Sequence, residues 1–331
     1  MATYFSRRAL VALGLAALST ATLSQVRTSA PAYPIRPVKL IVAAAAGSSP
    51  DAIARQLAIK LGAMWSQPVV IENVVGLGGI VGTERAAKAP SDGYTLVLST
   101  IGAMAVSGSL MEKLPYDPVK DFAPTSMAMS MPNLLVVHPS VPVSDVRGLI
   151  AYIKQNPGKL RYGHPGVGTS NHLSAEMFKQ MAGVKMEGVP YKSSAQMMTD
   201  LLAGHYEVLF HNSSVVLPHA RAGAAKILAI TSVERSRMLP EVPTVAEAAG
   251  LPGFSVNAWW GIYAPAGTPP DIVTKISGDV AAAVTQSDLK TWIDNQGGVP
   301  GGGTPQALAA FQASETQKWR ELIRAANIKA E

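Results

Sequence analysis

Apolar residues occur along this chain in short runs that alternate with stretches of helical periodicity. Runs at 38–42, 68–72 and 94–99 predict buried strands. The first is followed by small turn residues and by apolar positions four apart, such as Ile53 and Leu57, which is typical of a helix. Strands and helices alternating at this spacing predict parallel βαβ units that bind ligands at the carboxyl ends of the strands.

The middle of the chain predicts a second α/β lobe inserted into the first. Residues 133–139 form an extended run that leads into it, and 226–232 form a strand that returns from it. We expect residues 33–137 plus 230–331 to form lobe 1 and residues 138–229 to form lobe 2. The remaining predicted elements are strands at 160–163, 184–189, 206–210 and 254–264, helices at 83–89, 146–155, 171–181, 194–203, 270–284, 287–295 and 305–326, and a glycine surface loop at 301–303.

The first 32 residues have the pattern of an export signal. Arg7 and Arg8 precede a short apolar stretch, and small residues at 30–32 form a cleavage site before Tyr33. The paired arginines are compatible with the twin-arginine route, although other export signals also begin with basic residues. We therefore expect a periplasmic protein.

Charge and cysteine content exclude several classes of function. Cleavage removes three arginines and no acid, which lowers the formal net charge from +6 to +3. The remaining basic residues are scattered, so we expect no nucleic-acid partner. No cysteine is present, which excludes disulfides, thiolate metal sites and cysteine nucleophiles.

Two turns contain the candidate binding chemistry. After the first strand, Ser48 and Ser49 offer hydroxyls at the start of a helix, where free backbone N–H groups bind anions. The glycine-rich turn 163–170 resembles a phosphate loop, but it lacks the lysine, and it delivers Thr169 and Ser170 to another helix start. Both turns suit a carboxylate. The alternative for the first is an ordinary strand-to-helix turn of an α/β domain, and the alternative for the second is plain helix capping by Thr169 or Ser170.

Other candidate chemistry is weaker. The glycines of 76–82 imitate a dinucleotide-binding motif with the wrong spacing, so an NAD(P)-dependent oxidoreductase is the alternative function. None of the six histidines has the spacing of a zinc site, and no serine-hydrolase motif occurs, so we expect no metal, no cofactor and no enzyme activity. Thr100 lies at the end of one predicted strand, and His211 and Asn212 end another, where side chains can face a cleft.

Several segments of this chain resemble recurrent segments of one protein family, and they occur in the same order as in that family. Examples are Tyr-Pro-Ile-Arg-Pro at 33–37 and Val-Pro-Tyr-Lys at 189–192, and the others are 92–96, 114–122, 239–245 and 264–269. Over nearly the whole exported chain, the sequence is similar to the periplasmic solute receptors of tripartite tricarboxylate transporters, the Bug family.

This resemblance implies an α/β fold of the type II periplasmic binding protein class, with two lobes joined by a hinge and the ligand cleft between them. It implies a monomeric receptor that binds an organic carboxylate and presents it to membrane permease subunits. A ligand-sensing role toward a membrane kinase is a further alternative. The family's site maps to Ala45, Gly47, Ser48 and Ser49 in one turn, to Gly168, Thr169, Ser170 and His172 in the other, and to His211 and Asn212 at a strand end.

The chain departs from the family pattern at two places. Ser48, Ser49 and Pro50 replace a turn that in many members contains glycines and a threonine, which adds hydroxyls and removes one backbone donor. His211 replaces an acid, which removes a negative charge from the cleft. We expect the second change to favour a dicarboxylate, a tricarboxylate or an aromatic acid over an amino acid, whose ammonium group needs the missing acid.

Overall fold

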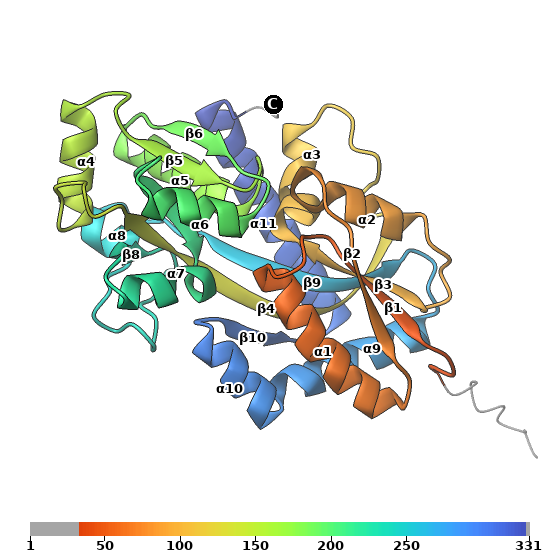
Figure 1. The fold of residues 1–331 in the computed structure, drawn as a ribbon. Coiled ribbons are helices and arrows are strands. Elements are labelled where there is room, and N and C mark those ends of the chain that lie inside the picture. Colours follow the sequence, from red (N-terminus) through yellow and green to blue (C-terminus); the bar gives the residue numbers. More distant parts are fainter. Residues whose placement is uncertain (1–32, 329–331) are drawn as a thin grey trace, which may run out of the picture. The chain divides into compact units, whose positions relative to one another are not determined.

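Ten strands form a hydrogen-bonded sheet in the order β2-β1-β3-β9-β4-β7-β5-β6, with β8 and β10 also paired to β4. The computed structural model describes residues 33–328, and residues 34 onward form one compact unit. The predicted export signal at 1–32 lies outside the described residues. Figure 1 shows helices on both sides of the strands of this unit.

Lobe 1 contains one end of the sheet. Strands β2 and β3 pair with β1 in parallel, as predicted, because the helices that connect them return the chain to the same end of the sheet. Strands β9 and β10 are antiparallel to their neighbours. The elements of lobe 1 are β1 (Val38–Val42), α1 (Ser49–Trp65), β2 (Val69–Asn73), η1 (Leu77–Gly79), α2 (Ile80–Ala87), β3 (Thr95–Thr100), η2 (Gly102–Val106), α3 (Ser107–Leu110), β9 (Asn257–Pro265), α9 (Pro270–Thr285), α10 (Ser287–Asn295), β10 (Val299–Gly302) and α11 (Pro305–Ala326).

Lobe 2 contains the other end, where β6 and β7 pair with β5 in parallel. Strands β7 and β8 are antiparallel to β4. The elements of lobe 2 are α4 (Val146–Gln155), β5 (Arg161–His164), α5 (Ser170–Ala182), β6 (Glu187–Pro190), α6 (Ser194–Leu202), β7 (Val208–Asn212), α7 (Ser213–Arg221), β8 (Lys226–Ile230) and α8 (Val245–Ala249).

Strand β4 (Phe122–Val137) belongs to both lobes and connects them. Its residues up to Pro132 pair with β9 of lobe 1, and its residues from Asn133 onward pair with β7 of lobe 2. The two lobes of the predicted fold are therefore present, and the long strand in Figure 1 runs through both of them. The residue boundaries 33–137 plus 230–331 and 138–229 stay a prediction, and α8, which lies beyond residue 230, is described with lobe 2 because it contacts α4 and β8.

Most of the predicted helices and strands are confirmed, and the exceptions depend on tertiary contacts. The surface loop predicted at 301–303 is wrong, because β10 pairs with β4 through Val299, Pro300 and Gly302. A Cβ atom on Gly301 would lie 2.3 Å from the backbone oxygen of Met127, so only glycine allows the two strands to approach this closely.

Apolar burial holds the elements together. Trp259 of β9 and Trp319 of α11 are both completely buried, and their indole N–H groups both donate to the Glu315 carboxylate.

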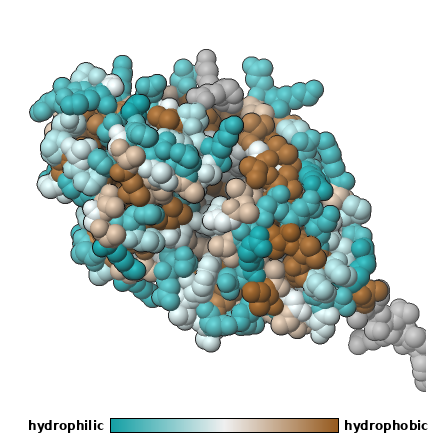
Figure 2. Space-filling view, in the orientation of Figure 1, coloured by the Kyte–Doolittle hydropathy of each residue, from teal (hydrophilic) through white to brown (hydrophobic). Residues whose placement is uncertain are grey.

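Figure 2 shows the exposed apolar residues of one face in separate groups between hydrophilic ones. None of the helices within residues 33–328 combines the length and the apolar character that a membrane crossing requires.

Candidate functional site

A cavity of about 600 Å³ lies between the lobes, at the carboxyl ends of the parallel strands. The segments that follow β1, β2 and β3 form its wall in lobe 1, and those that follow β5, β6 and β7 form its wall in lobe 2. This is the position where open parallel sheets bind ligands. Residues 43–50, 75–79, 100–102, 165, 169–171, 191–195, 211–212, 258 and 260 line it.

The first turn is held in place by the buried carboxylate of Asp51. This carboxylate accepts hydrogen bonds from the Gly47 N–H at 2.9 Å, from Arg55 at 2.9 Å and from Asn73 at 2.9 Å. Burial alone would raise the pKa of Asp51, but these hydrogen bonds outweigh it and lower the pKa below its usual value. Asp51 therefore stays charged and fixes the turn, but it does not line the cavity.

The serine hydroxyls of this turn do not cap helix α1. Ser48 occupies the N-cap position, but its hydroxyl donates to the Ala45 carbonyl oxygen at 2.6 Å instead of accepting from the helix. The N–H groups at the start of α1 therefore have no side-chain cap, and the turn that contains them lines the cavity. The expectation that Ser48 caps this helix is therefore wrong.

The glycine turn between β2 and α2 packs closely against the first turn. A Cβ atom on Gly79 would lie 2.9 Å from the Ala43 carbonyl oxygen and 3.0 Å from the Thr100 hydroxyl oxygen. Thr100 lines the cavity, and its hydroxyl donates to the Gly78 carbonyl oxygen at 3.0 Å. The glycines at 76–79 therefore form part of the cavity wall.

The second predicted turn delivers only some of its predicted residues to the cavity. Thr169 and Ser170 line it, and the Thr169 hydroxyl donates to the Gly166 carbonyl oxygen at 2.7 Å rather than capping α5. Gly168 and His172 do not line it. Gly168 has a φ of 81°, a value that glycine adopts without strain, and it shapes the turn.

His172 lies behind the turn in a cluster of aromatic rings. Its ring centroid is 5.0 Å from that of His164 and 6.3 Å from that of Tyr162. Burial, with a smaller contribution from His164, lowers the pKa of His172 to about 4. Within residues 33–328, no group of three or more His, Cys, Asp or Glu side chains is placed to hold a metal ion.

His211 and Asn212 both line the cavity at the end of β7. The Asn212 amide donates to the Asn133 side-chain oxygen at 3.0 Å, which fixes its orientation. His211 is 2% exposed, and neither ring nitrogen has a hydrogen-bond partner among the described residues. Burial lowers the pKa of His211 to about 4, so the ring is neutral at pH 7 and offers one donor and one acceptor.

Several helices begin at this cavity, and four of them have a polar N-cap residue: α1, α5, α6 and α7. Their N-cap residues are Ser48, Thr169, Ser193 and Asn212, and all four line the cavity. Only the Ser193 side chain caps its helix, at 3.2 Å from the Gln196 N–H. Because a helix N-terminus has a partial positive charge and unpaired N–H groups, four of them directed at one cavity favour an anion.

Sequence reasoning missed part of the cavity wall, including the side chain of Lys192. Among the residues that line the cavity, Lys192 is the one Lys, Arg, Asp or Glu, and it is exposed. Thr100 and His211 are candidates because side chains at the ends of strands can face a cleft. The same reasoning applies to residues 191–195, which follow β6, and to residues 75–79, which follow β2. Trp260 had no such signal, because it lies within antiparallel β9.

A comparison with protein families agrees with this geometry. The model of the tripartite tricarboxylate transporter family receptor matches residues 53–328. The protein BugT of Bordetella pertussis is 37% identical over 302 residues, which cover 91% of this chain and 92% of BugT. A Pseudomonas protein of the tcbD-tcbE intergenic region is 36% identical over 317 residues, which cover 96% of this chain and 93% of that protein.

Solved structures of similar sequence have the same fold. An R. palustris protein solved with adipate matches with a TM-score of 0.86 at 37% identity, covering 90% of this chain and all of the other. MatC from Rhodopseudomonas palustris, solved with bound malate, matches with a TM-score of 0.81 at 32% identity, covering 88% of this chain and all of MatC. The chain therefore belongs to the tripartite tricarboxylate transporter receptor family.

Proposed function

We propose that this protein is a periplasmic receptor that binds a small organic carboxylate between its lobes and delivers it to the permease of a tripartite tricarboxylate transporter. The observation that carries the proposal is the arrangement of four helix N-termini around one cavity that no acidic side chain of residues 33–328 lines. Backbone N–H groups at these helix starts, the Ser170 hydroxyl and Lys192 supply donors to an anion from both lobes. The Ser48 and Thr169 hydroxyls already donate to carbonyl oxygens, so they add shape and polarity to the wall rather than donors.

Within this class, we propose a ligand with a second acceptor group, such as a dicarboxylate, a tricarboxylate or an aromatic acid. The neutral His211 ring has an unpaired donor that a second carboxylate satisfies, and no carboxylate lines the cavity to bind an ammonium group. The similar proteins solved with adipate and with malate hold dicarboxylates.

The remaining parts of the proposal follow from membership of a receptor family. A receptor needs donors on both lobes and a hinge, and it needs no activated nucleophile and no cofactor, so we propose binding without catalysis. We propose that it acts as a monomer and engages the membrane permease subunits in its ligand-bound form. A sensing role, in which this form contacts a membrane kinase, would use the same site.

A thermal-shift screen tests the proposed function. The exported form, beginning at Tyr33, is mixed with mono-, di- and tricarboxylates, aromatic acids, amino acids and nicotinamide nucleotides. A ligand that binds only the folded state raises the unfolding midpoint. We expect a selective rise with one class of carboxylate, whereas a rise with nicotinamide nucleotides alone would overturn the receptor and support the oxidoreductase.

A competition titration tests the ligand subclass separately. We expect dicarboxylates to displace amino acids from the wild-type protein, and His211→Asp to weaken dicarboxylate binding by tenfold or more through repulsion between carboxylates. His205→Asp, at an exposed side chain outside the cavity, is the matched control. If aspartate or glutamate outcompetes every dicarboxylate on the wild type, the assignment of the subclass is wrong.

A further inference from the structure

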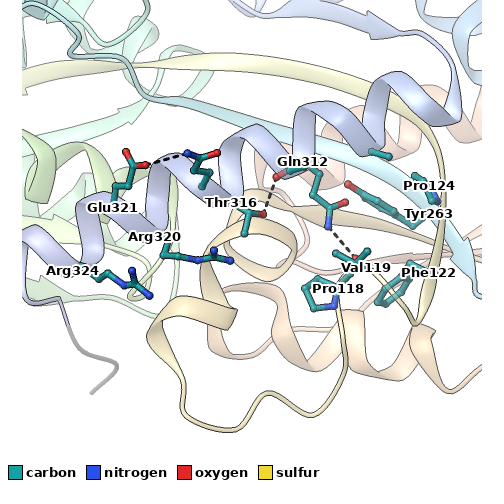
Figure 3. Close-up of a pocket in the computed structure, with 13 residues that line it drawn as sticks. Pro118, Val119, Phe122, Pro124, Tyr263, Gln312, Thr316, Arg320, Glu321 and Arg324 are labelled. Carbon is teal, nitrogen blue, oxygen red and sulfur yellow. Dashed lines mark hydrogen bonds between the residues drawn. The ribbon is translucent and has the colours of Figure 1, made fainter.

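A second cavity, of about 560 Å³, lies beside helix α11 and shares no lining residue with the cavity between the lobes. Figure 3 shows it between α11, the start of β4 and the segment that contains Pro118 and Val119. Its volume is within the range of about 300–1,000 Å³ that small-molecule sites occupy.

One end of this cavity is apolar. Phe122 and Tyr263 meet there edge to face, with ring centroids 6.1 Å apart. Val119 forms part of the wall and is 74% exposed, so its side chain is accessible to a ligand. On the facing side, Ala309 and Ala313 of α11 are too small to fill the space. This end therefore suits an apolar chain or ring.

The other end is cationic. Arg320 and Arg324 are four residues apart on α11, so they lie on the same face of the helix as Ala309 and Ala313. Both are exposed, and neither forms an ion pair with any residue of the described chain. One acid, Glu321, also lines this end, and its carboxylate accepts a hydrogen bond from the Gln317 amide at 3.3 Å. Two guanidinium groups against one carboxylate leave a net positive charge.

The floor of the apolar end contains an unsatisfied polar group. The Tyr263 hydroxyl is completely buried and has no hydrogen-bond partner among the described residues, although buried hydroxyls are normally paired. Figure 3 shows the Tyr263 side chain lying next to Gln312 of α11. The Gln312 amide is already used, because it donates to the Pro118 carbonyl oxygen at 3.0 Å and to the Met104 carbonyl oxygen at 3.1 Å. These two bonds fix the wall of the cavity.

The geometry points to a second binding site, distinct from the cleft, for an amphiphilic monocarboxylate. The apolar chain of the ligand lies against Val119, Ala309 and Ala313, above the buried Phe122 and Tyr263 rings, and its carboxylate lies between Arg320 and Arg324. Arg320 is seven residues from Ala313, or about 10 Å along the helix axis, which leaves room for a chain of several carbon atoms. A single cationic end selects one carboxylate at one end of the ligand.

The test uses octanoate as the probe and isothermal titration of the purified protein. We expect saturable binding of octanoate, and binding at least tenfold weaker for octanamide, which has a similar chain and no charge. We expect Arg320→Gln with Arg324→Gln to weaken octanoate binding at least tenfold. Ala313→Trp fills the apolar end with an indole and should abolish octanoate binding.

A cleft variant distinguishes this site from the receptor site. Thr169→Ala with Ser170→Ala should leave octanoate binding within twofold of the wild type, because neither residue lines the second cavity. The proposal is overturned if octanoate does not bind, if it binds as weakly as octanamide, or if the cleft variant loses it while the arginine and Ala313 variants keep it. Since the readout is independent of the cleft ligand, failure here leaves the proposed receptor function intact.

Discussion

His211 shows how a single buried side chain can be costly to the fold and useful to the site. Its ring gives up hydration on folding and gains no hydrogen bond among the described residues, which costs free energy. The cost is compensated if a ligand supplies the partner. A buried, unpaired polar group at the wall of a cavity is therefore a stronger indication of binding than the hydroxyls around it.

The burial of His211 predicts a loss of stability in acid. Its pKa is about 4 in the folded protein and 6.5 for the ordinary side chain, so the unfolded chain binds the proton first as the pH falls. Above pH 6.5 the free energy of unfolding does not depend on the titration of this group. As the pH falls from 6.5 to 4 the free energy of unfolding decreases, by roughly 3 kcal/mol for a pKa shift of this size. We expect His211→Gln to flatten this part of the curve of unfolding free energy against pH, measured with denaturant.

His205→Gln is the control for this measurement, because the His205 side chain is 67% exposed. The control should follow the wild-type curve. His172, whose pKa is also lowered to about 4, should keep part of the acid dependence in the His211 variant. Identical slopes for wild type and His211→Gln would mean that His211 is not buried in the folded state.

Thr169 and Ser170 lead to a prediction about affinity. Their hydroxyls lie at the uncapped start of α5 and line the cavity. We expect Thr169→Ala with Ser170→Ala to weaken binding of the carboxylate found in the screen by tenfold or more, with the circular dichroism spectrum unchanged. Thr304→Ala removes the hydroxyl that caps α11 outside the cavity, so it should lower stability and leave the affinity as it is. An unchanged dissociation constant in the double variant would remove both residues from the site.

At the scale of elements, the sequence predicts what local patterns determine and misses what tertiary contacts determine. Helices α10 and α11 begin and end where the apolar periodicity places them. Strand β10 was missed because its glycines are typical of a loop, and their function is to let β10 approach β4. Helix α7 was missed as well, since Pro218 lies inside it and proline normally interrupts helical patterns.

The candidate site was predictable wherever it depends on strand ends. Nine of the eleven predicted site residues line the cavity, and the exceptions are Gly168 and His172. These two were carried over from the family pattern, and no periodicity shows whether a residue beside a turn faces the cavity or lies behind it. Lys192 follows β6 and the same reasoning from strand ends would have found it, whereas Trp260 was missed because it lies within antiparallel β9.

The connection between the lobes depends on Thr231, which follows strand β8. Its buried hydroxyl accepts from the Asn133 N–H at 2.8 Å and donates to the Val256 carbonyl oxygen at 2.6 Å. Asn133 is the residue at which β4 passes from one lobe to the other. The hydroxyl therefore ties three chain segments together at the hinge.

We expect Thr231→Val to lower the free energy of unfolding by about 1–3 kcal/mol, because it leaves a buried N–H and a buried carbonyl without this partner. The measurement is denaturant unfolding at pH 7. Thr274→Val is the matched control, since the exposed Thr274 hydroxyl donates only to a carbonyl of its own helix, and it should change stability by less than about 0.5 kcal/mol. Equal effects of the two substitutions would show that the hinge bonds add nothing.

At the scale of the whole molecule, direct hydrogen bonds join the two lobes. The Ser214 hydroxyl at the start of α7 lies 3.0 Å from the Ser49 hydroxyl at the start of α1. The neighbouring Ser213 hydroxyl donates to the Gln296 carbonyl oxygen at 2.8 Å. Both bonds join lobe 2 to lobe 1, and neither Ser213 nor Ser214 lines the cavity. They bias the molecule toward the arrangement in which both lobes can contact one ligand.

Removing these two bonds should therefore weaken binding without changing a residue that lines the cavity. Apparent affinity decreases in proportion to the fraction of molecules in the binding-competent arrangement. We expect Ser213→Ala with Ser214→Ala to raise the dissociation constant about threefold to tenfold, and to increase the radius of gyration of the ligand-free protein in small-angle X-ray scattering. Ser314→Ala, whose exposed hydroxyl bonds only within α11, is the control. Weaker binding at an unchanged radius would locate the loss in the site itself, whereas unchanged values of both would mean that the ligand alone brings the lobes together.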